Sequence, residues 1–344
     1  MTGDDVGQVF ILAGIIERIG WEKVKTAPQG RVLVTGASGQ IGSELVPALR
    51  ARYGNDKVVA LYHANKPEDA GSGPFEVADA TDRAAMKGII EKNGISTVYH
   101  LVGILSAAGE KDPEKCWRVN MDSLKIFLDF AREYGFERMF WPSSIAAFGP
   151  TTPRENTPQH TVLEPSTMYC ATKVAGELLA SYYWTKYGVD VRSIRYPGLN
   201  SWKTPPGGGT TDYAVAIYYD ALRKGSYECF LSESTYLPMM YMDDAIRGTI
   251  DLLEADLSKT PYRIAYNFSA MSLCPREIAA DINRRIPGFR VSYRPDFRQK
   301  IADSWPKSID DSQARKDWGW KPEYDLSKMT DAMLENLKKK FGIE

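Results

Sequence analysis

A glycine-rich loop after an apolar segment limits what this chain can fold into more than any other feature. The loop reads TGASGQIG at residues 35–42, directly after the apolar segment 31–35 and before a helix-like segment over 41–52. Gly36 permits a tight turn, Gly39 lets the backbone approach a pyrophosphate, and Gly42 lets the helix pack closely on the strand. The helix N-terminus supplies free N–H donors and a dipole that favours phosphate. The loop therefore predicts a dinucleotide-binding unit, because glycines placed by chance rarely fall in such a strand-turn-helix setting.

Strand-like and helix-like segments alternate over the next 160 residues. The strand-like segments are 31–35, 58–62, 75–79, 97–103, 138–144 and 189–197, and the clearest helical ones are 41–52, 119–134 and 166–187. This alternation predicts an α/β fold, a Rossmann-type doubly wound parallel sheet. After Pro197 the rhythm changes: residues 241–246 indicate a return to the sheet, and the chain from about residue 260 indicates a smaller C-terminal α+β substrate lobe.

The expected organisation is an N-terminal extension, a nucleotide-binding domain and a substrate lobe. The extension covers residues 1–30, and the Rossmann domain covers 31–197 with a return segment at about 236–255. The substrate-binding lobe comprises 198–235 and 256–344. Within the extension the apolar run 9–16 is too short to span a bilayer, and no positive run precedes it, so a secretory signal is not expected.

Composition excludes several classes of partner. The formal net charge of -1 leaves no basic excess, so neither nucleic acid nor an anionic membrane is expected to bind. The 4 cysteines are scattered without a CxxC pair, which indicates a reducing compartment such as the cytoplasm or the mitochondrial matrix. The 3 histidines are far apart, so no metal site is expected.

The end of the second strand departs from the usual dinucleotide pattern. That position commonly holds an acid that binds the adenosine ribose, but here it holds Tyr62 and His63. No arginine replaces the acid, and Lys66 is the nearest cation. Asp79 ends the third strand, where it either accepts from the adenine amino group or simply caps the loop.

Three side chains suggest the chemistry. Tyr169 and Lys173 are four residues apart on a predicted helix, so they project from the same face. We expect Lys173 to favour the Tyr169 phenolate and to lower its pKa, which lets the tyrosine take a proton from an alcohol. Ser144 ends a predicted strand 25 residues before Tyr169. A parallel sheet brings strand ends, and hence these groups and the glycine loop, to one edge.

Several motifs resemble the extended short-chain dehydrogenase/reductase family. They are TGASGQIG at 35–42, HLVG at 100–103, PSSIAAFG at 142–149, YCATK at 169–173, RYPG at 195–198 and DDSQARKDWGWKP at 310–322. The resemblance covers about residues 31–330. It implies the catalytic set Ser144, Tyr169 and Lys173, with Lys173 also binding the nicotinamide ribose.

A narrower resemblance is carried by EPSTMY at 164–169, by 197–215 and by LPMMYMDDAI at 237–246. These segments are similar to the short-chain-type L-threonine 3-dehydrogenases, in which glycine usually follows the catalytic tyrosine, where this chain has Cys170. The resemblance implies oxidation of the C3 hydroxyl of L-threonine to 2-amino-3-oxobutyrate with NAD, a step of threonine catabolism. Donors of the 207–211 loop are expected to hold the substrate carboxylate, and its glycines permit it to close as a lid.

The resemblance and the glycine loop together give full residue sets for both ligands. The expected cofactor contacts are Gly36, Ser38, Gly39, Gln40, Ile41, Gly42, Tyr62, His63, Asp79, Ala80, Leu101, Val102, Gly103, Tyr169, Lys173, Tyr196 and Leu199. The expected substrate contacts are Ser106, Ser143, Ser144, Tyr169, Thr210 and Thr211.

Two other functions share parts of this pattern. A nucleotide-sugar 4-epimerase or dehydratase has the same loop and the same Tyr and Lys, but it needs cations for a second pyrophosphate. A non-catalytic nucleotide-binding regulator need not keep Ser144, Tyr169 and Lys173 together. The long helices 119–134 and 166–187 carry apolar residues on more than one face, and in related enzymes such helices pair, so a homodimer is expected.

Overall fold

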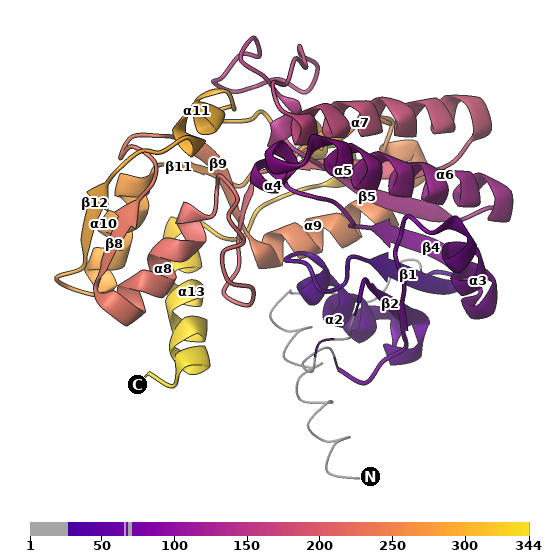
Figure 1. The fold of residues 1–344 in the computed structure, drawn as a ribbon, viewed down its shortest axis with the longest axis horizontal. Helices are drawn as coiled ribbons and strands as arrows, with labels where there is room; N and C mark the ends of the chain where they lie inside the picture. Colours follow the sequence, from indigo (N-terminus) through magenta and orange to yellow (C-terminus); the bar gives the residue numbers. More distant parts are fainter. Residues whose placement is uncertain (1–26, 65–66, 68–70, 344) are drawn as a thin grey trace.

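A seven-stranded parallel sheet forms the centre of the molecule (Figure 1). The structure, a computed structural model, describes residues 27–64, 67 and 71–343, so most of the predicted extension and Lys66 lie outside it. The strand order is β10-β6-β5-β4-β1-β2-β3, which confirms the predicted doubly wound sheet. The strands are β1 (Arg31–Thr35), β2 (Val58–Tyr62), β3 (Phe75–Val77), β4 (Ile95–His100), β5 (Arg138–Ser144), β6 (Val191–Tyr196) and β10 (Tyr266–Asn267).

The inner strands are buried on both faces, which explains their uninterrupted apolar sequences. In β1, Val32 and Val34 point to the core on one side of the sheet, and Leu33 points to the core on the other side. Successive side chains of a strand point to opposite faces, so both faces need an apolar residue. Full burial of each such side chain stabilises the fold by roughly 1.5–3 kcal/mol.

Helices cover both faces (Figure 1). One face carries α3 (Arg83–Asn93), α6 (Ser123–Tyr134) and α7 (Met168–Tyr187), and the other carries α2 (Gly42–Tyr53) and α9 (Met242–Glu254). Two short helices, α4 (Ser106–Lys111) and α5 (Pro113–Trp117), contact α7. A π-helical turn, Arg118–Asp122, joins α5 to α6.

The C-terminal lobe has small sheets and its own helices. Its strands are β7 (Gly198–Asn200), β8 (Ser226–Cys229), β9 (Leu237–Tyr241), β11 (Met271–Leu273) and β12 (Arg290–Tyr293). Its helices are α8 (Tyr213–Lys224), α10 (Pro275–Arg285), α11 (Arg298–Asp303), α12 (Ser312–Trp318) and α13 (Leu326–Phe341). The core of this lobe includes Tyr169 and Cys170 at the start of α7, so the two parts of the molecule share packing where the catalytic residues were predicted.

The predicted return to the main sheet at 241–246 is wrong. Strand β9 pairs with β7 and β11 in a separate sheet, and Met242 already begins α9. What returns is the helix, since α9 packs on β5 and β6. The main sheet gains its seventh strand from β10, in a segment assigned to the substrate lobe. Two residues are too few for periodicity to indicate a strand.

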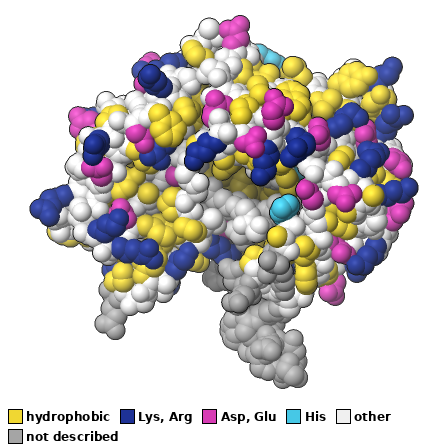
Figure 2. Space-filling view, viewed as in Figure 1, with side chains coloured by type: hydrophobic (Ala, Val, Ile, Leu, Met, Phe, Trp, Pro, Cys, Tyr) yellow, Lys and Arg dark blue, Asp and Glu magenta, His cyan; other side chains and the backbone are white. Residues whose placement is uncertain are grey.

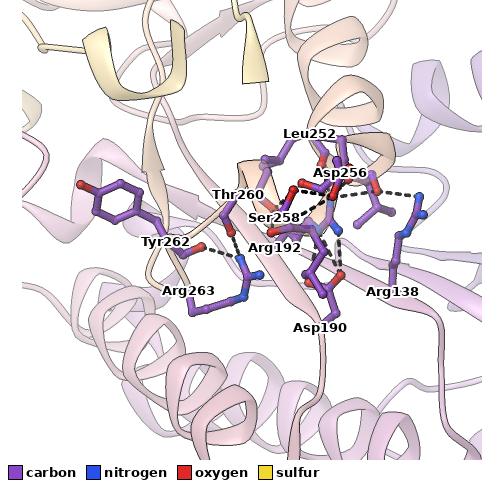
Figure 3. A network of polar contacts seen from close by, with 12 residues as sticks. Arg138, Asp190, Arg192, Leu252, Asp256, Ser258, Thr260, Tyr262 and Arg263 are labelled. Atoms are coloured by element: carbon purple, nitrogen blue, oxygen red, sulfur yellow. Dashed lines mark hydrogen bonds and ion pairs between the residues drawn. The ribbon is translucent and has the colours of Figure 1, made fainter. Parts of the chain in front are cut away.

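A buried arginine holds the C-terminal end of α9 against the sheet (Figure 3). Arg192 of β6 donates to the carbonyls of Leu252 and Ala255 at 2.8 and 2.6 Å, and pairs with Asp190 at 2.8 Å. The last carbonyls of a helix lack partners within it and carry partial negative charge, so a cation there stabilises the helix end. This network lies at the opposite end of the strands from the predicted site.

Candidate active site

The glycine loop has the conformation that its sequence predicts. Gly36 has a φ of 65°, in the left-handed region, and a Cβ there would lie 3.1 Å from the carbonyl carbon of Leu101. A Cβ on Gly42 would lie 2.3 Å from the oxygen of Gly36, so the helix can approach only if residue 42 has no side chain. A Cβ on Gly39 would meet only the Gly36 oxygen, at 3.2 Å, which leaves its outer face open.

The N-terminus of α2 offers free donors beside this open face. The backbone N–H groups of Gln40 and Ile41 reach no acceptor in the part of the chain that the structure describes. Two free donors and the positive end of the helix dipole suit a pyrophosphate. The residues present therefore fit a dinucleotide.

A pocket of about 160 Å³ lies at the carboxyl ends of the strands, next to this loop. It receives residues from the glycine loop, from the ends of β4, β5 and β6, from α7 and from the C-terminal lobe. The predicted residues that it brings together are Gln40, Ile41, Leu101, Gly103, Ser106, Ser143, Ser144, Tyr169, Lys173, Tyr196, Leu199, Thr210 and Thr211.

Tyr169 and Ser144 meet in this pocket. The hydroxyl of Tyr169 lies near that of Ser144, which accepts from the N–H of Ala146 at 3.1 Å. Burial raises the pKa of Tyr169 well above its usual value, and the nearby Ser144 hydroxyl opposes that rise. Removing a phenolate from water costs more than its neighbours return, so burial outweighs any lowering of the Tyr169 pKa by Lys173.

Lys173 lies one turn further along α7 and is also buried. Its ammonium donates to the carbonyl of Pro142 at 2.6 Å and lies 5.4 Å from the centre of the Tyr169 ring. Burial lowers its pKa to about 8, although the carboxylate of Glu177 opposes this effect. The pocket thus contains an ammonium that is close to releasing its proton near neutral pH.

Glu177 belongs to a buried ion pair behind the pocket. It binds Arg195 through two hydrogen bonds, at 2.8 and 3.0 Å, and accepts from the hydroxyl of Ser143 at 2.5 Å. The Ser143 proton is thus directed at Glu177, so the structure favours a positioning role for Ser143 over a substrate contact. Tyr169, Lys173 and Glu177 follow one another at intervals of four residues, so they lie on one face of α7.

The glycine-rich loop before α8 contributes two threonines. Thr210 is buried, and its hydroxyl has no partner in the described residues, although it borders the pocket. An unpaired buried hydroxyl is costly, so it marks a place for a ligand atom. The N–H groups of Gly207 and Gly209 donate to Asp212 at 2.7 and 2.8 Å. These two N–H groups are therefore engaged by Asp212, and the prediction that donors of the 207–211 loop hold the substrate rests on its other groups, such as the Thr210 hydroxyl.

The other predicted cofactor residues lie outside the pocket. Gly36, Ser38, Gly39 and Gly42 form the glycine loop, and Val102 packs into a core cluster. At the expected adenosine end, Tyr62 and Ala80 are buried. His63 lies 3.8 Å from Asp79, whose Oδ1 accepts twice from Thr81. Because β2 pairs with β3, Asp79 places beside His63 the carboxylate that the second strand lacks.

Sequence reasoning missed several residues of the site. Leu105, Asp212 and Trp305 border the pocket, and Asn120 binds both backbone groups of Ile104 and the hydroxyl of Thr172. Trp305 comes from the C-terminal lobe, and nothing in its sequence context indicates this. The π-helical turn that contains Asn120 has no recognised sequence signal either. Leu105 and Asp212 directly adjoin the predicted residues Ser106 and Thr211, so the sequence could have indicated them.

No group of three or more His, Cys, Asp or Glu side chains among the described residues is arranged to hold a metal ion. No helix in the part of the chain that the structure describes is both long and apolar enough to cross a membrane.

Comparisons with known proteins agree with this geometry. The profile of the family described as the NAD dependent epimerase/dehydratase family matches residues 32–267. An uncharacterized epimerase/dehydratase of Staphylococcus haemolyticus is 51% identical over 313 residues, which are 90% of this chain and 98% of that protein.

Solved structures give a narrower likeness. A GalE-like L-threonine dehydrogenase from Cupriavidus necator, in its holo form, is 53% identical with a TM-score of 0.87 and covers 90% of this chain and 100% of its own. A monomeric L-threonine 3-dehydrogenase from a metagenome is 51% identical with a TM-score of 0.87, covering 90% and 99%.

Proposed function

Since this chain belongs to the NAD-dependent epimerase/dehydratase family, we propose that it is an oxidoreductase, an L-threonine 3-dehydrogenase that uses NAD. It oxidises the C3 hydroxyl of L-threonine to give 2-amino-3-oxobutyrate. Solved structures about half identical to the chain over nearly its whole length have that name.

The observation that carries the proposal is the meeting of Tyr169, Ser144 and Lys173 with the unpaired hydroxyl of Thr210 in one small pocket. Tyr169, Ser144 and Lys173 together form a binding site for an alcohol, with a proton acceptor. Thr210 adds a buried polar group that can bind a polar substrate. Ser106, which is also buried, lines the same space.

The proposed chemistry assigns one task to each residue. Ser144 binds the C3 hydroxyl of the substrate, and Tyr169 takes its proton as general base. The ammonium of Lys173 supplies a positive charge on the same helix face, which favours the phenolate during that step. Bound NAD would supply the acceptor for the hydride that leaves C3. Thr210 donates to or accepts from the polar end of the amino acid.

The pocket argues against the rival within the family. A nucleotide-sugar substrate carries a second pyrophosphate, which needs cations. Among the described lining residues the only cation is Lys173, and the other charged residue is the acid Asp212. A pocket with so few cations suits a small amino acid better than a nucleotide sugar.

One assay tests the proposal. The purified protein is incubated with NAD and either L-threonine or UDP-glucose, and the absorbance of reduced nicotinamide is followed. We expect turnover with L-threonine only, and a loss of at least about 100-fold in kcat for Tyr169→Phe, in the range of general base contributions. Turnover with the sugar nucleotide alone would reject the proposal, and a Phe variant with near-normal kcat would reject Tyr169 as the base.

NAD is proposed to bind in preference to NADP, although less exclusively than with an acid on the second strand. The carboxylate of Asp79 is the negative group near the expected ribose, and it is shared with Thr81 and His63. A 2′-phosphate would be repelled by this carboxylate.

We also propose a homodimer formed through α6 and α7. The outer face of α7 exposes Leu178 and Tyr182, which are 58% and 51% exposed, and Figure 2 shows apolar side chains gathered over this helix at the upper right. One similar solved structure is named as monomeric, so the oligomeric state of this chain needs its own measurement. Light scattering at micromolar concentration decides it, since a mass near 38.5 kDa would exclude the dimer.

The compartment is proposed to be a reducing one, the cytoplasm or the mitochondrial matrix. All 4 cysteines are free and buried in the structure. A count of four reactive thiols in denatured protein purified without reductant tests this, since a lower count would indicate oxidation.

A further inference from the structure

A buried histidine that the proposed chemistry does not use lies directly behind the cofactor site. His100 ends β4 and has no exposed surface. Its Nδ1 lies 2.9 Å from the hydroxyl of Thr35, and its Nε2 lies 3.0 Å from the hydroxyl of Ser123. The histidine thus joins the last residue of β1 to the first turn of α6.

The partners of the two hydroxyls fix the direction of every hydrogen bond. Ser123 is 2.6 Å from the carbonyl of Val119, which can only accept, so its proton goes there and it must accept from Nε2 of His100. Thr35 accepts from the N–H of Leu101 at 3.0 Å, and its own proton goes to Nδ1. Burial, with the charge of Lys173, lowers the pKa of His100 to about 3, so the ring is neutral with its hydrogen on Nε2.

The hydrogen bonds that link Thr35, His100 and Ser123 end on the carbonyl of Val119, in an irregular helical turn. Val119 and Asn120 lie in the π-helical turn Arg118–Asp122, which directly precedes Ser123. Asn120 holds Ile104 by its N–H at 2.7 Å and by its carbonyl at 3.1 Å. Such turns often occur at functional sites because they turn side chains out of the helical repeat.

The segment 101–104 is therefore held at both ends from the same turn. At one end Ser123, His100 and Thr35 act in series on the N–H of Leu101, and at the other end Asn120 holds Ile104. Leu101 and Gly103 of this segment line the pocket. The next residue after Thr35 is Gly36, which touches Leu101 and Val102 so closely that it has no room for a side chain.

We propose that His100 and Ser123 are positioning residues that fix the 101–104 wall of the pocket against the glycine loop and so set the affinity for the nicotinamide cofactor. The proposal rests on the proposed function only for the identity of the cofactor. Neither residue is assigned a contact with substrate or cofactor. Their effect passes through Thr35 and the Leu101 backbone.

Paired variants of Ser123 give the test. Ser123→Ala removes the acceptor for Nε2, whereas Ser123→Thr keeps a hydroxyl that can bond the carbonyl four residues back. We expect Ser123→Ala to raise the Kd for NADH about fivefold to tenfold, the effect of one lost buried hydrogen bond, and Ser123→Thr to stay within about twofold of the parent. Kd is measured by nicotinamide fluorescence, which needs no turnover and stays informative if L-threonine is not the substrate.

Variants of His100 give a second, independent measurement. Asn at this position offers an acceptor to Thr35 but is too short to reach Ser123, so Ser123→Ala should add almost nothing in the His100→Asn background. A purely structural role predicts instead a lower unfolding midpoint with an unchanged Kd. A folded Ser123→Ala variant with the parent Kd would overturn the proposal, as would an equal effect of Ser123→Ala in both backgrounds.

Discussion

Lys173 is expected to cost this protein stability at neutral pH, and Lys173→Met should reveal that cost. The buried ammonium has its pKa lowered from 10.5 to about 8. Since one pKa unit corresponds to about 1.36 kcal/mol, a drop from 10.5 to about 8 corresponds to about 3 kcal/mol of free energy of unfolding. The methionine variant has no charge to bury.

The sign of the pH dependence follows from proton binding. Below pH 8 both folded and unfolded chains carry the proton, so the folded protein pays the full cost of a buried charge. Between pH 8 and 10.5 only the unfolded chain binds it, so the parent gains stability as pH rises. Met lacks this titration, and it leaves the Pro142 carbonyl without its donor at a pH-independent cost of roughly 1 kcal/mol. Lys173→Met should therefore be more stable by about 2 kcal/mol at pH 7 and less stable by about 1 kcal/mol near pH 10.5.

Urea unfolding at pH 7, 8.5 and 10, followed by tryptophan fluorescence, measures this difference. The control is Lys125→Met on α6, where the side chain is 51% exposed and Asp129 raises the pKa of the lysine, so no gain in stability is expected at any of these pH values. Lys173→Met should also lose activity. A difference between variant and parent that stays constant from pH 7 to 10 would refute the reasoning.

Three other outcomes are expected. Asp212→Ala should raise KM for L-threonine about tenfold while Kd for NADH stays within twofold, because the loop loses two charge-assisted hydrogen bonds of roughly 1.5–3 kcal/mol each; steady-state kinetics and fluorescence titration check both, and an unchanged KM contradicts it. Arg192→Met should lower the free energy of unfolding by about 3 kcal/mol, since it removes the ion-pair partner of Asp190 and the donor to the Ala255 carbonyl; urea unfolding checks it, and a loss below 1 kcal/mol contradicts it. Asp79→Asn should shift the kcat/KM ratio about tenfold toward NADP by removing the carboxylate beside His63; an unmoved ratio places the discrimination elsewhere.

The sequence predicts a local feature of this protein well where a single physical constraint determines which residue type can occupy a position. Gly36 and Gly42 are constrained by a positive φ and by a close approach, which only glycine tolerates. Tyr169 and Lys173 share a helix face by spacing alone. The buried strands follow from apolar runs, because a sheet covered on both faces needs apolar side chains throughout.

Features that depend on distant partners could not be predicted. The pKa of Tyr169 depends on burial by the C-terminal lobe, which no local pattern contains. Trp305 reaches the pocket across more than a hundred residues from α7, and the proton of Ser143 goes to Glu177, an acid that only the folded chain brings near. Strand β10 is too short to carry any periodic signal.

Because of the two-residue strand β10, the chain cannot be divided in sequence into two independent domains. It follows α9 in a segment assigned to the substrate lobe, yet it pairs with β6, and Asn267 is held by Gln159 and Arg195. A cut anywhere between residues 198 and 265 would thus leave neither half with a complete sheet. Fragments or domain transplants taken from this enzyme therefore need to carry both lobes.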